Sequence, residues 1–249
     1  MHYTFQSTVL PGIITAIAAY LLGSISFSII FTRLYAGHAD IRDMGSGNAG
    51  ATNVMRSVGK RPAILTFLCD FLKCAISIAI GREVFCYFGA LSGFVETDLA
   101  LLSWYGSYVA GISCLIGHIY PVYYGFRGGK GVVTCAAMVA LIDWRAFVIE
   151  ILIFIVLFAK TRMVSVGSIV ALSLHPVVTF LVTFFLDYKT GMISKWGERP
   201  GIAYVVASTV FALIIASLTV IKHLPNIKRI LNGTESQLLS SPHSRAGVL

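Results

Sequence analysis

A glycine-rich segment in the first quarter of the chain has the composition of an anion-binding loop. It reads Gly45-Ser46-Gly47-Asn48-Ala49-Gly50-Ala51-Thr52-Asn53, and Arg56 follows it. Small and hydroxyl residues among glycines let backbone N–H groups turn toward an anion, and the guanidinium of Arg56 can bind a phosphate through two parallel hydrogen bonds. A plain flexible loop is the competing interpretation, because the segment matches neither the Walker nor the dinucleotide-binding pattern.

A second glycine cluster carries a lysine at the start of an apolar stretch. The residues Gly128-Gly129-Lys130-Gly131 lead directly into an apolar stretch that predicts a helix. The N–H groups of this segment and the positive end of the helix dipole would then converge on one place, which favours an anion. Lys130 and Arg127 could instead be anchors at the membrane surface, but the clustered glycines favour the anion site.

Two residues in a basic segment near the C-terminus could act on a bound anion. His223 and Asn226 are three positions apart, so both could face a substrate, one as a group that titrates near neutrality and one as a hydrogen-bonding amide. An interfacial helix that only contacts lipid headgroups is the alternative. Ser165 and Ser168 begin another apolar stretch and would lie at the same depth as the glycine loops, although such hydroxyls usually cap helices.

Three further polar residues are interpreted as structural. Asp70 and Lys73 lie one helical turn apart within an apolar stretch. Charges inside a membrane are costly unless they are paired or functional, so we expect these two to pair with each other. His118, at the end of a predicted helix, is expected to be a structural hydrogen-bond partner.

Transmembrane helices must position all of these residues. The chain is 57% hydrophobic and only 12% charged, whereas a soluble domain is about 45–50% apolar and about 25% charged. The composition predicts an all-α integral membrane protein. Its seven expected spans are residues 8–33, 62–81, 98–118, 130–143, 145–160, 164–186 and 201–222. The fourth and fifth are short, so a single merged span or a re-entrant hairpin is the alternative there.

The distribution of Lys and Arg orients these spans. Of the 19 Lys and Arg residues, most fall on the face that carries the two glycine loops and the C-terminal basic segment. The positive-inside rule therefore predicts that the N-terminus lies outside and that the glycine loops and the C-terminus are cytoplasmic. Topology also explains the net charge of +8, so no nucleic-acid partner is expected. Residues 236–249 predict a mobile cytoplasmic tail.

Six segments, taken in order, resemble the bacterial acyl-phosphate-dependent glycerol-3-phosphate acyltransferase family. They are GSISFSIIFTRL, DIRDMGSGNAGATNVMR, DFLK, GHIYPVYYGFRGGKGVVT, VSVGSI and HLPNIKRILNGTE. The resemblance implies a seven-span enzyme of the bacterial inner membrane, with residues 1–235 as the acyltransferase domain and the active site on the cytoplasmic side. Such an enzyme transfers a fatty acyl group from acyl phosphate to the 1-hydroxyl of glycerol 3-phosphate. The products are lysophosphatidic acid and phosphate, in an early step of phospholipid synthesis.

The resemblance also implies roles for the residues that match the family's motifs. Ser46, Arg56, His223 and Asn226 would be catalytic, and Glu235 would be structural. The residues implied to bind the substrates are Thr52, Asn53, Gly128, Gly129, Lys130, Gly131 and Ser165.

No metal or cofactor is expected, and the expected partners are glycerol 3-phosphate, acyl phosphate and membrane lipid. The five cysteines contain no CxxC pair, and no metal-ligand signature is present. Acyl phosphate is an activated mixed anhydride, so the hydroxyl can attack it directly without an acyl-Ser46 intermediate. Either His223 or the substrate phosphate would then be the base. The alternative function is a transporter of a phosphate-bearing metabolite, which would place polar groups along a transmembrane path.

Overall fold

The computed structural model describes residues 5–191 and 200–238, and all regular structure in these ranges is helical. Two π-helical segments, Phe5–Val9 and Val182–Lys189, extend α1 and α8. The α-helices are α1 (Leu10–Gly23), α2 (Phe27–Tyr35), α3 (Ala51–Ser57), α4 (Lys60–Leu91), α5 (Glu96–Ile119), α6 (Val132–Ile142), α7 (Trp144–Thr161), α8 (Val164–Leu181), α9 (Ile202–Lys222) and α10 (Leu224–Leu231).

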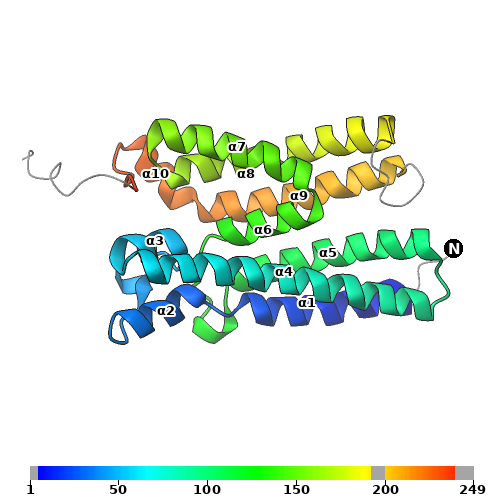
Figure 1. Cartoon of the computed structure of the whole chain (residues 1–249), viewed down its shortest axis with the longest axis horizontal. Helices are drawn as coiled ribbons and strands as arrows, with labels where there is room; N and C mark the ends of the chain where they lie inside the picture. Colours follow the sequence, from blue (N-terminus) through cyan, green and yellow to red (C-terminus); the bar gives the residue numbers. More distant parts are fainter. Residues whose placement is uncertain (1–4, 192–199, 239–249) are drawn as a thin grey trace, which may run out of the picture.

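The long helices form two groups that are joined by α6. Helices α1, α4 and α5 pack together, as do α7, α8 and α9, and α6 lies between the groups (Figure 1). Aromatic rings also connect α5 to α9: the centroid of Trp104 lies 4.9 Å from that of Tyr204, and Tyr108 stacks on Phe211 at 4.5 Å. Such ring pairs stabilise a contact by about 0.5–1.5 kcal/mol beyond the burial of their surface. They therefore hold the two groups together.

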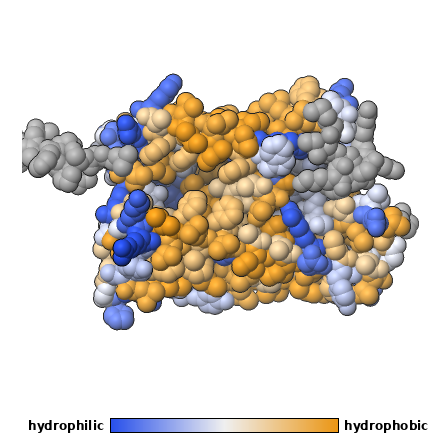
Figure 2. All heavy atoms as spheres, viewed as in Figure 1, coloured by the Kyte–Doolittle hydropathy of each residue, from blue (hydrophilic) through white to orange (hydrophobic). Residues whose placement is uncertain are grey.

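The outer surface of the bundle is suited to lipid. Figure 2 shows hydrophobic side chains over the middle of the molecule, with hydrophilic atoms at the end formed by α2, α3 and α10 and further hydrophilic atoms toward the opposite end. Leu72 and Leu213 on this surface are each more than half exposed. Five helical stretches are long and apolar enough to cross a membrane: Phe5–Tyr35, Lys60–Leu91, Glu96–Tyr124, Val164–Lys189 and Ile202–Lys222.

The spans expected at 130–143 and 145–160 correspond to α6 and α7, which are separated at Asp143. Helix α6 has 11 residues, about 16 Å of length at about 1.5 Å per residue. It is too short to cross alone, and α7 carries three charged residues, Arg145, Glu150 and Lys160. Neither helix belongs to the five stretches above. A total of seven crossings therefore stays a prediction.

The span expected at residues 8–33 corresponds to the stretch Phe5–Tyr35, but its helix is interrupted at residues 24–26, between α1 and α2. Gly23, just before the break, packs directly against the backbone of α5. After it, the carbonyl of Ile25 accepts a hydrogen bond of 2.8 Å from Lys73 Nζ. This bond satisfies a carbonyl that an interrupted helix leaves without a helical partner.

Part of the sequence-based expectation concerns residues that the structure does not describe. Lys195 and Arg199, which fall between the spans expected at 164–186 and 201–222 and therefore on the predicted outer face, lie outside the described residues, as does the predicted tail from residue 239 onward. The first residues of that tail are described. There, Leu238 N–H donates to the carbonyl of Arg162 over 2.9 Å.

Candidate active site

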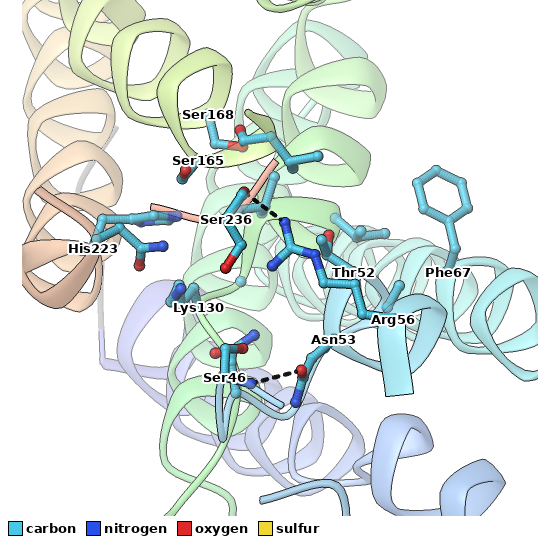
Figure 3. Close-up of a pocket in the computed structure, with 18 of the residues that line it drawn as sticks. Ser46, Thr52, Asn53, Arg56, Phe67, Lys130, Ser165, Ser168, His223 and Ser236 are labelled. Carbon is cyan, nitrogen blue, oxygen red and sulfur yellow. Dashed lines mark hydrogen bonds between the residues drawn. The ribbon is translucent and has the colours of Figure 1, made fainter. Parts of the chain in front are cut away.

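A pocket of about 210 Å³ lies between the two helical groups, close to α3 and α10. The predicted site residues that line it come from both glycine segments, the start of α8 and the junction of α9 with α10 (Figure 3). They are Ser46, Thr52, Asn53, Arg56, Lys130, Gly131, Ser165, His223 and Asn226. Residues up to 180 positions apart in the chain thus share one cavity, and of the predicted set only Gly128 and Gly129 do not line it.

The first glycine loop is held in shape by Asn53, which is 2% exposed. Its Oδ1 accepts from the backbone N–H of Ser46 at 3.0 Å, and its Nδ2 donates to the carbonyls of Ile41 and Met44. The backbone N–H of Asn53 donates to Gly50 O, so it is already engaged within the loop. The side chain of Asn53 therefore places Ser46 at the pocket.

Two cations face the pocket without a carboxylate partner in the described ranges. Arg56 donates from Nη2 to the backbone carbonyl of Ser236 at 3.0 Å, and Lys130 forms no ion pair there. A third cation of the pocket, Arg229, donates to Glu235 at 2.7 Å and is neutralised by it. The unpaired positive charge at the pocket thus resides on Arg56 and Lys130, which suits an anionic ligand.

Burial is the main cause that lowers the pKa of Lys130 to about 8, with the positive charges of Arg229 and Arg56 acting in the same direction and Glu235 opposing them. The ammonium group is therefore charged at neutral pH and titrates just above it. A bound phosphate would stabilise the charged form, which makes this cation sensitive to its ligand.

We expect kcat/KM for a phosphate-bearing substrate to fall as the pH rises through about 8, because the free enzyme then loses the charge on Lys130. Lys130→Arg should remove this decline or move it to higher pH, since a guanidinium stays charged. Initial rates at subsaturating substrate between pH 6.5 and 9.5 would test this. An identical alkaline decline in wild type and Lys130→Arg would contradict the assignment.

His223 is buried at the junction of α9 and α10, and its ring has a defined tautomer. Nδ1 lies 2.7 Å from the carbonyl oxygen of Thr219. Because a carbonyl only accepts, Nδ1 carries the hydrogen and the neutral ring has its lone pair on Nε2. Burial lowers the pKa of His223, and the nearby Lys130 acts in the same direction. The imidazole is therefore neutral at physiological pH and can accept a proton.

Asn226, one turn after His223, presents an unsatisfied acceptor. Its Nδ2 donates to Glu235 Oε1 at 2.7 Å, which fixes the amide orientation. Its Oδ1 is buried without a hydrogen-bond partner in the described part of the chain. Leaving such an atom unpaired costs about 1–3 kcal/mol, so a hydroxyl of a ligand would be a favourable partner.

Gly128 and Gly129 do not line the pocket but pack against the end of α5. Their N–H groups donate to the carbonyls of Ile119 and His118, each over 3.2 Å. A Cβ at Gly128 would overlap the backbone of α5, and one at Gly129 would overlap His118 and Ala49. These glycines therefore let the segment before Lys130 press against α5.

Gly128→Ala is expected to lower the free energy of unfolding by about 1–3 kcal/mol, the usual cost of overpacking, because its Cβ would meet the carbonyl of His118. Gly12→Ala in α1 is the matched control, since its Cβ would meet only Phe85 at 3.9 Å. Thermal unfolding in detergent should separate the two variants. Equal unfolding temperatures would contradict this account.

A buried charged cluster behind the pocket goes beyond what the sequence predicted. Lys73 lies 2.8 Å from Asp70 Oδ1, so the predicted pairing is confirmed. Lys73 Nζ is also 3.0 Å from His118 Nδ1, which confirms His118 as a hydrogen-bond partner. Asp70 and His118 both line the pocket as well. The spacing of Asp70 and Lys73 predicted their pairing but not their contact with His118, because that contact joins α4 to α5.

The pocket also has an apolar wall that the sequence did not single out. It is formed by Phe67 of α4, Phe154 of α7 and residues at the starts of α6 and α8. Phe67 is 47% exposed at the outer surface of the bundle, and Figure 3 shows it at the edge of the site. The pocket thus combines a cationic side with an apolar side that faces the bilayer. Within the described ranges, no group of His, Cys, Asp and Glu could hold a metal ion.

Comparisons with known proteins agree on one family. The family model described as "Glycerol-3-phosphate acyltransferase" matches residues 13–233. Proteins of that name from Chlorobaculum parvum and Clostridioides difficile are each 37% identical to this chain, over 88% and 91% of it and over 93% and 95% of their own lengths.

Solved structures give the same result. A crystal structure of PlsY, an integral membrane glycerol 3-phosphate acyltransferase in its glycerol 3-phosphate form, matches with a TM-score of 0.69 and 33% identity. The match covers 91% of this chain and 94% of that one. The lysophosphatidic acid form of PlsY matches with a TM-score of 0.67 and 32% identity. The chain therefore belongs to the glycerol-3-phosphate acyltransferase family.

Proposed function

We propose that this chain transfers a fatty acyl group from acyl phosphate to the 1-hydroxyl of glycerol 3-phosphate in the pocket described above. Membership of the family makes the protein a membrane acyltransferase that acts on glycerol 3-phosphate in phospholipid synthesis. The observation that supports this pocket is the presence of two unpaired cations, Arg56 and Lys130, beside the neutral imidazole of His223. A reaction between two phosphate-bearing substrates needs this combination of positive charge and a base.

The two phosphates are assigned to different sides of the pocket. Lys130 and the glycine segment before α6 bind the phosphate of glycerol 3-phosphate, and Gly128 and Gly129 contribute by letting this segment pack against α5. Arg56 binds the acyl phosphate, with Ser46 and Thr52 as further donors on the same side. Positive charge on both sides offsets the repulsion between the substrates and holds them in contact.

Glycerol is oriented by the polar atoms between these two sides. Asn226 Oδ1, which Glu235 holds in place, accepts a hydrogen bond from a substrate hydroxyl. Ser165 lines the same region from the start of α8. The transferable hydroxyl then lies near His223 Nε2, whose lone pair is available.

Transfer proceeds by direct attack. The 1-hydroxyl oxygen forms a bond to the acyl carbonyl carbon while its proton passes to His223 Nε2. The carbonyl oxygen takes up negative charge, which Arg56 and the loop N–H groups stabilise. When the carbon–oxygen bond to phosphate breaks, its electron pair leaves with the phosphate, and the proton held by His223 returns to that phosphate. The reaction therefore needs no metal and no net proton.

The acyl chain extends along the apolar wall into the bilayer. Phe67 and Phe154 lie on different helices, α4 and α7, on the side of the pocket that faces lipid. An acyl chain placed between them stays in an apolar environment while its phosphate reaches Arg56. Lateral access from the membrane follows from this arrangement.

Purified protein should convert acyl phosphate and labelled glycerol 3-phosphate into lysophosphatidic acid. Acyl-coenzyme A and acyl carrier protein thioesters, offered separately, test whether acyl phosphate is the donor. Lysophosphatidic acid formed only from a thioester would reject the donor assignment. Rapid quenching followed by mass spectrometry tests direct transfer, and an acyl group on Ser46 during turnover would reject it.

We also propose seven crossings of a bacterial inner membrane by residues 1–235, with the N-terminus outside and the pocket and C-terminus in the cytoplasm. The excess of Lys and Arg beside the pocket end supports this orientation. Fluorescent-protein and alkaline-phosphatase fusions to the C-terminus provide the test. Phosphatase activity without fluorescence would place the C-terminus outside and reject the topology.

A further inference from the structure

A second cavity lies away from the active-site pocket and contains an arginine. It has a volume of about 260 Å³, and it lies where α4, α5 and the end of α6 meet. Its lining residues are Arg82, Ala100, Ser103, Trp104, Ser107, Leu141 and Ile142. None of these residues lines the active-site pocket.

The guanidinium of Arg82 is held rigidly in this cavity. Its Nε donates to Ser107 Oγ at 2.8 Å, and its Nη2 donates to the carbonyl of Leu141 at 2.7 Å. Ser107 in turn donates to the carbonyl of Ser103 at 2.9 Å, so its hydroxyl is also fixed. The bond to Leu141 satisfies one of the carbonyls that the end of α6 leaves without a helical partner.

Arg82 retains donors and charge after these two bonds. A guanidinium has five N–H donors, and the two bonds use two of them. No carboxylate among residues 5–191 and 200–238 forms an ion pair with Arg82. A partly buried cation without a counter-ion is costly, which favours an anionic ligand at this position.

The depth of the cavity points to a lipid. Lys60 and Arg61 are exposed at the start of α4, at the end of the bundle near the pocket. Arg82 lies 22 residues after Lys60 along the same helix, which corresponds to about 33 Å. The hydrocarbon core of a bilayer is about 30 Å thick. Arg82 is therefore at headgroup level in the leaflet opposite the pocket.

The other lining residues match the two parts of a lipid. Leu141, Ile142 and Ala100 form an apolar wall suited to an acyl chain, and Ser103 adds a hydroxyl beside Arg82. Trp104 contributes the kind of aromatic ring that is common at the membrane interface. We propose that this cavity binds an anionic phospholipid, with the phosphate on Arg82 and the chain along the end of α6.

The probes are phosphatidylglycerol, phosphatidylcholine and inorganic phosphate, each added to the purified full-length protein and measured by native mass spectrometry. We expect phosphatidylglycerol to bind most tightly, because the ammonium of phosphatidylcholine would face the cation. Arg82→Gln should weaken phosphatidylglycerol binding about tenfold or more, as expected for loss of a charge-assisted hydrogen bond. Lys189→Gln, which removes another cation at the same end of the molecule, should leave binding unchanged.

A variant that fills the cavity separates lipid binding from the hydrogen bond of Arg82 to Leu141 at the end of α6. Ala100→Phe places a ring in the cavity and leaves both hydrogen bonds of Arg82 in place. It should lose phosphatidylglycerol binding as Arg82→Gln does, while its acyltransferase activity shows that it folds. Unchanged lipid binding in Ala100→Phe would overturn the proposal. The proposal would also be overturned if millimolar inorganic phosphate displaced bound phosphatidylglycerol as effectively as added lipid does, since the cavity would then be a site for a free anion.

Discussion

Alanine in place of His223 is expected to lower kcat by about 10²- to 10⁴-fold, the range typical for the loss of a positioned general base. The expectation rests on the tautomer that Thr219 enforces, because a donor at Nδ1 leaves the lone pair on Nε2. It rests also on the low pKa of the buried ring, which keeps the imidazole neutral at physiological pH. Steady-state rates with acyl phosphate and labelled glycerol 3-phosphate provide the measurement.

A second variant distinguishes a base from an orienting group. His223→Gln keeps a hydrogen-bonding side chain but cannot take up a proton. If His223 is the base, both variants should lose activity to a similar extent, and added imidazole should restore part of the activity of His223→Ala. A fall in kcat of less than about tenfold for His223→Gln, with a higher KM for glycerol 3-phosphate, would instead make the substrate phosphate the base.

The helices of this protein follow from local composition, and so does their membrane environment. Long apolar stretches predict α4, α5, α8 and α9 because a lipid-facing helix needs no pattern beyond length and hydrophobicity. The break at residues 24–26 does not follow in this way. The carbonyl of Ile25 in this break accepts a hydrogen bond from Lys73 of α4, and the sequence of the first apolar stretch alone cannot reveal a partner on another helix.

The candidate site was predictable to the extent that its residues occur in compact motifs. Glycines next to a cation indicated Arg56 and Lys130 because anion binding needs small residues and positive charge close together in the chain. Phe67 and Phe154 are ordinary residues of apolar helices, and only the packing of α4 near α7 brings them to the pocket. The contact between His118 of α5 and Lys73 of α4 likewise depends on the packing of the two helices.

The ion pair in the basic segment near the C-terminus could be identified only from the structure. The sequence shows several basic residues near the C-terminus but does not say which of them is neutralised. Glu235 lies six positions after Arg229, beyond the reach of regular helical spacing, and pairs with it across the turn that follows α10. The same carboxylate holds Asn226. Because Glu235 pairs with Arg229, Arg56 and Lys130 are the cations of the pocket that form no ion pair among the described residues.

Arg56→Ala is expected to lower kcat/KM for acyl phosphate by about 10²- to 10³-fold, the effect of removing one donor that stabilises developing charge. Arg56 now donates to the neutral carbonyl of Ser236, and a phosphate is a stronger acceptor because charge-assisted hydrogen bonds are about twice as strong. Arg56→Lys should recover only part of the loss, since an ammonium cannot make two parallel bonds.

Arg229→Ala is the matched control for Arg56→Ala, because both arginines line the pocket and each variant removes one positive charge. Arg229 is already paired with Glu235 at 2.7 Å, so its charge is not available to a phosphate. We therefore expect Arg229→Ala to affect stability more than kcat/KM, with a loss in kcat/KM at least tenfold smaller than that of Arg56→Ala. Equal losses in the two variants would mean that the pocket attracts its substrates through total charge rather than through a phosphate bound at Arg56.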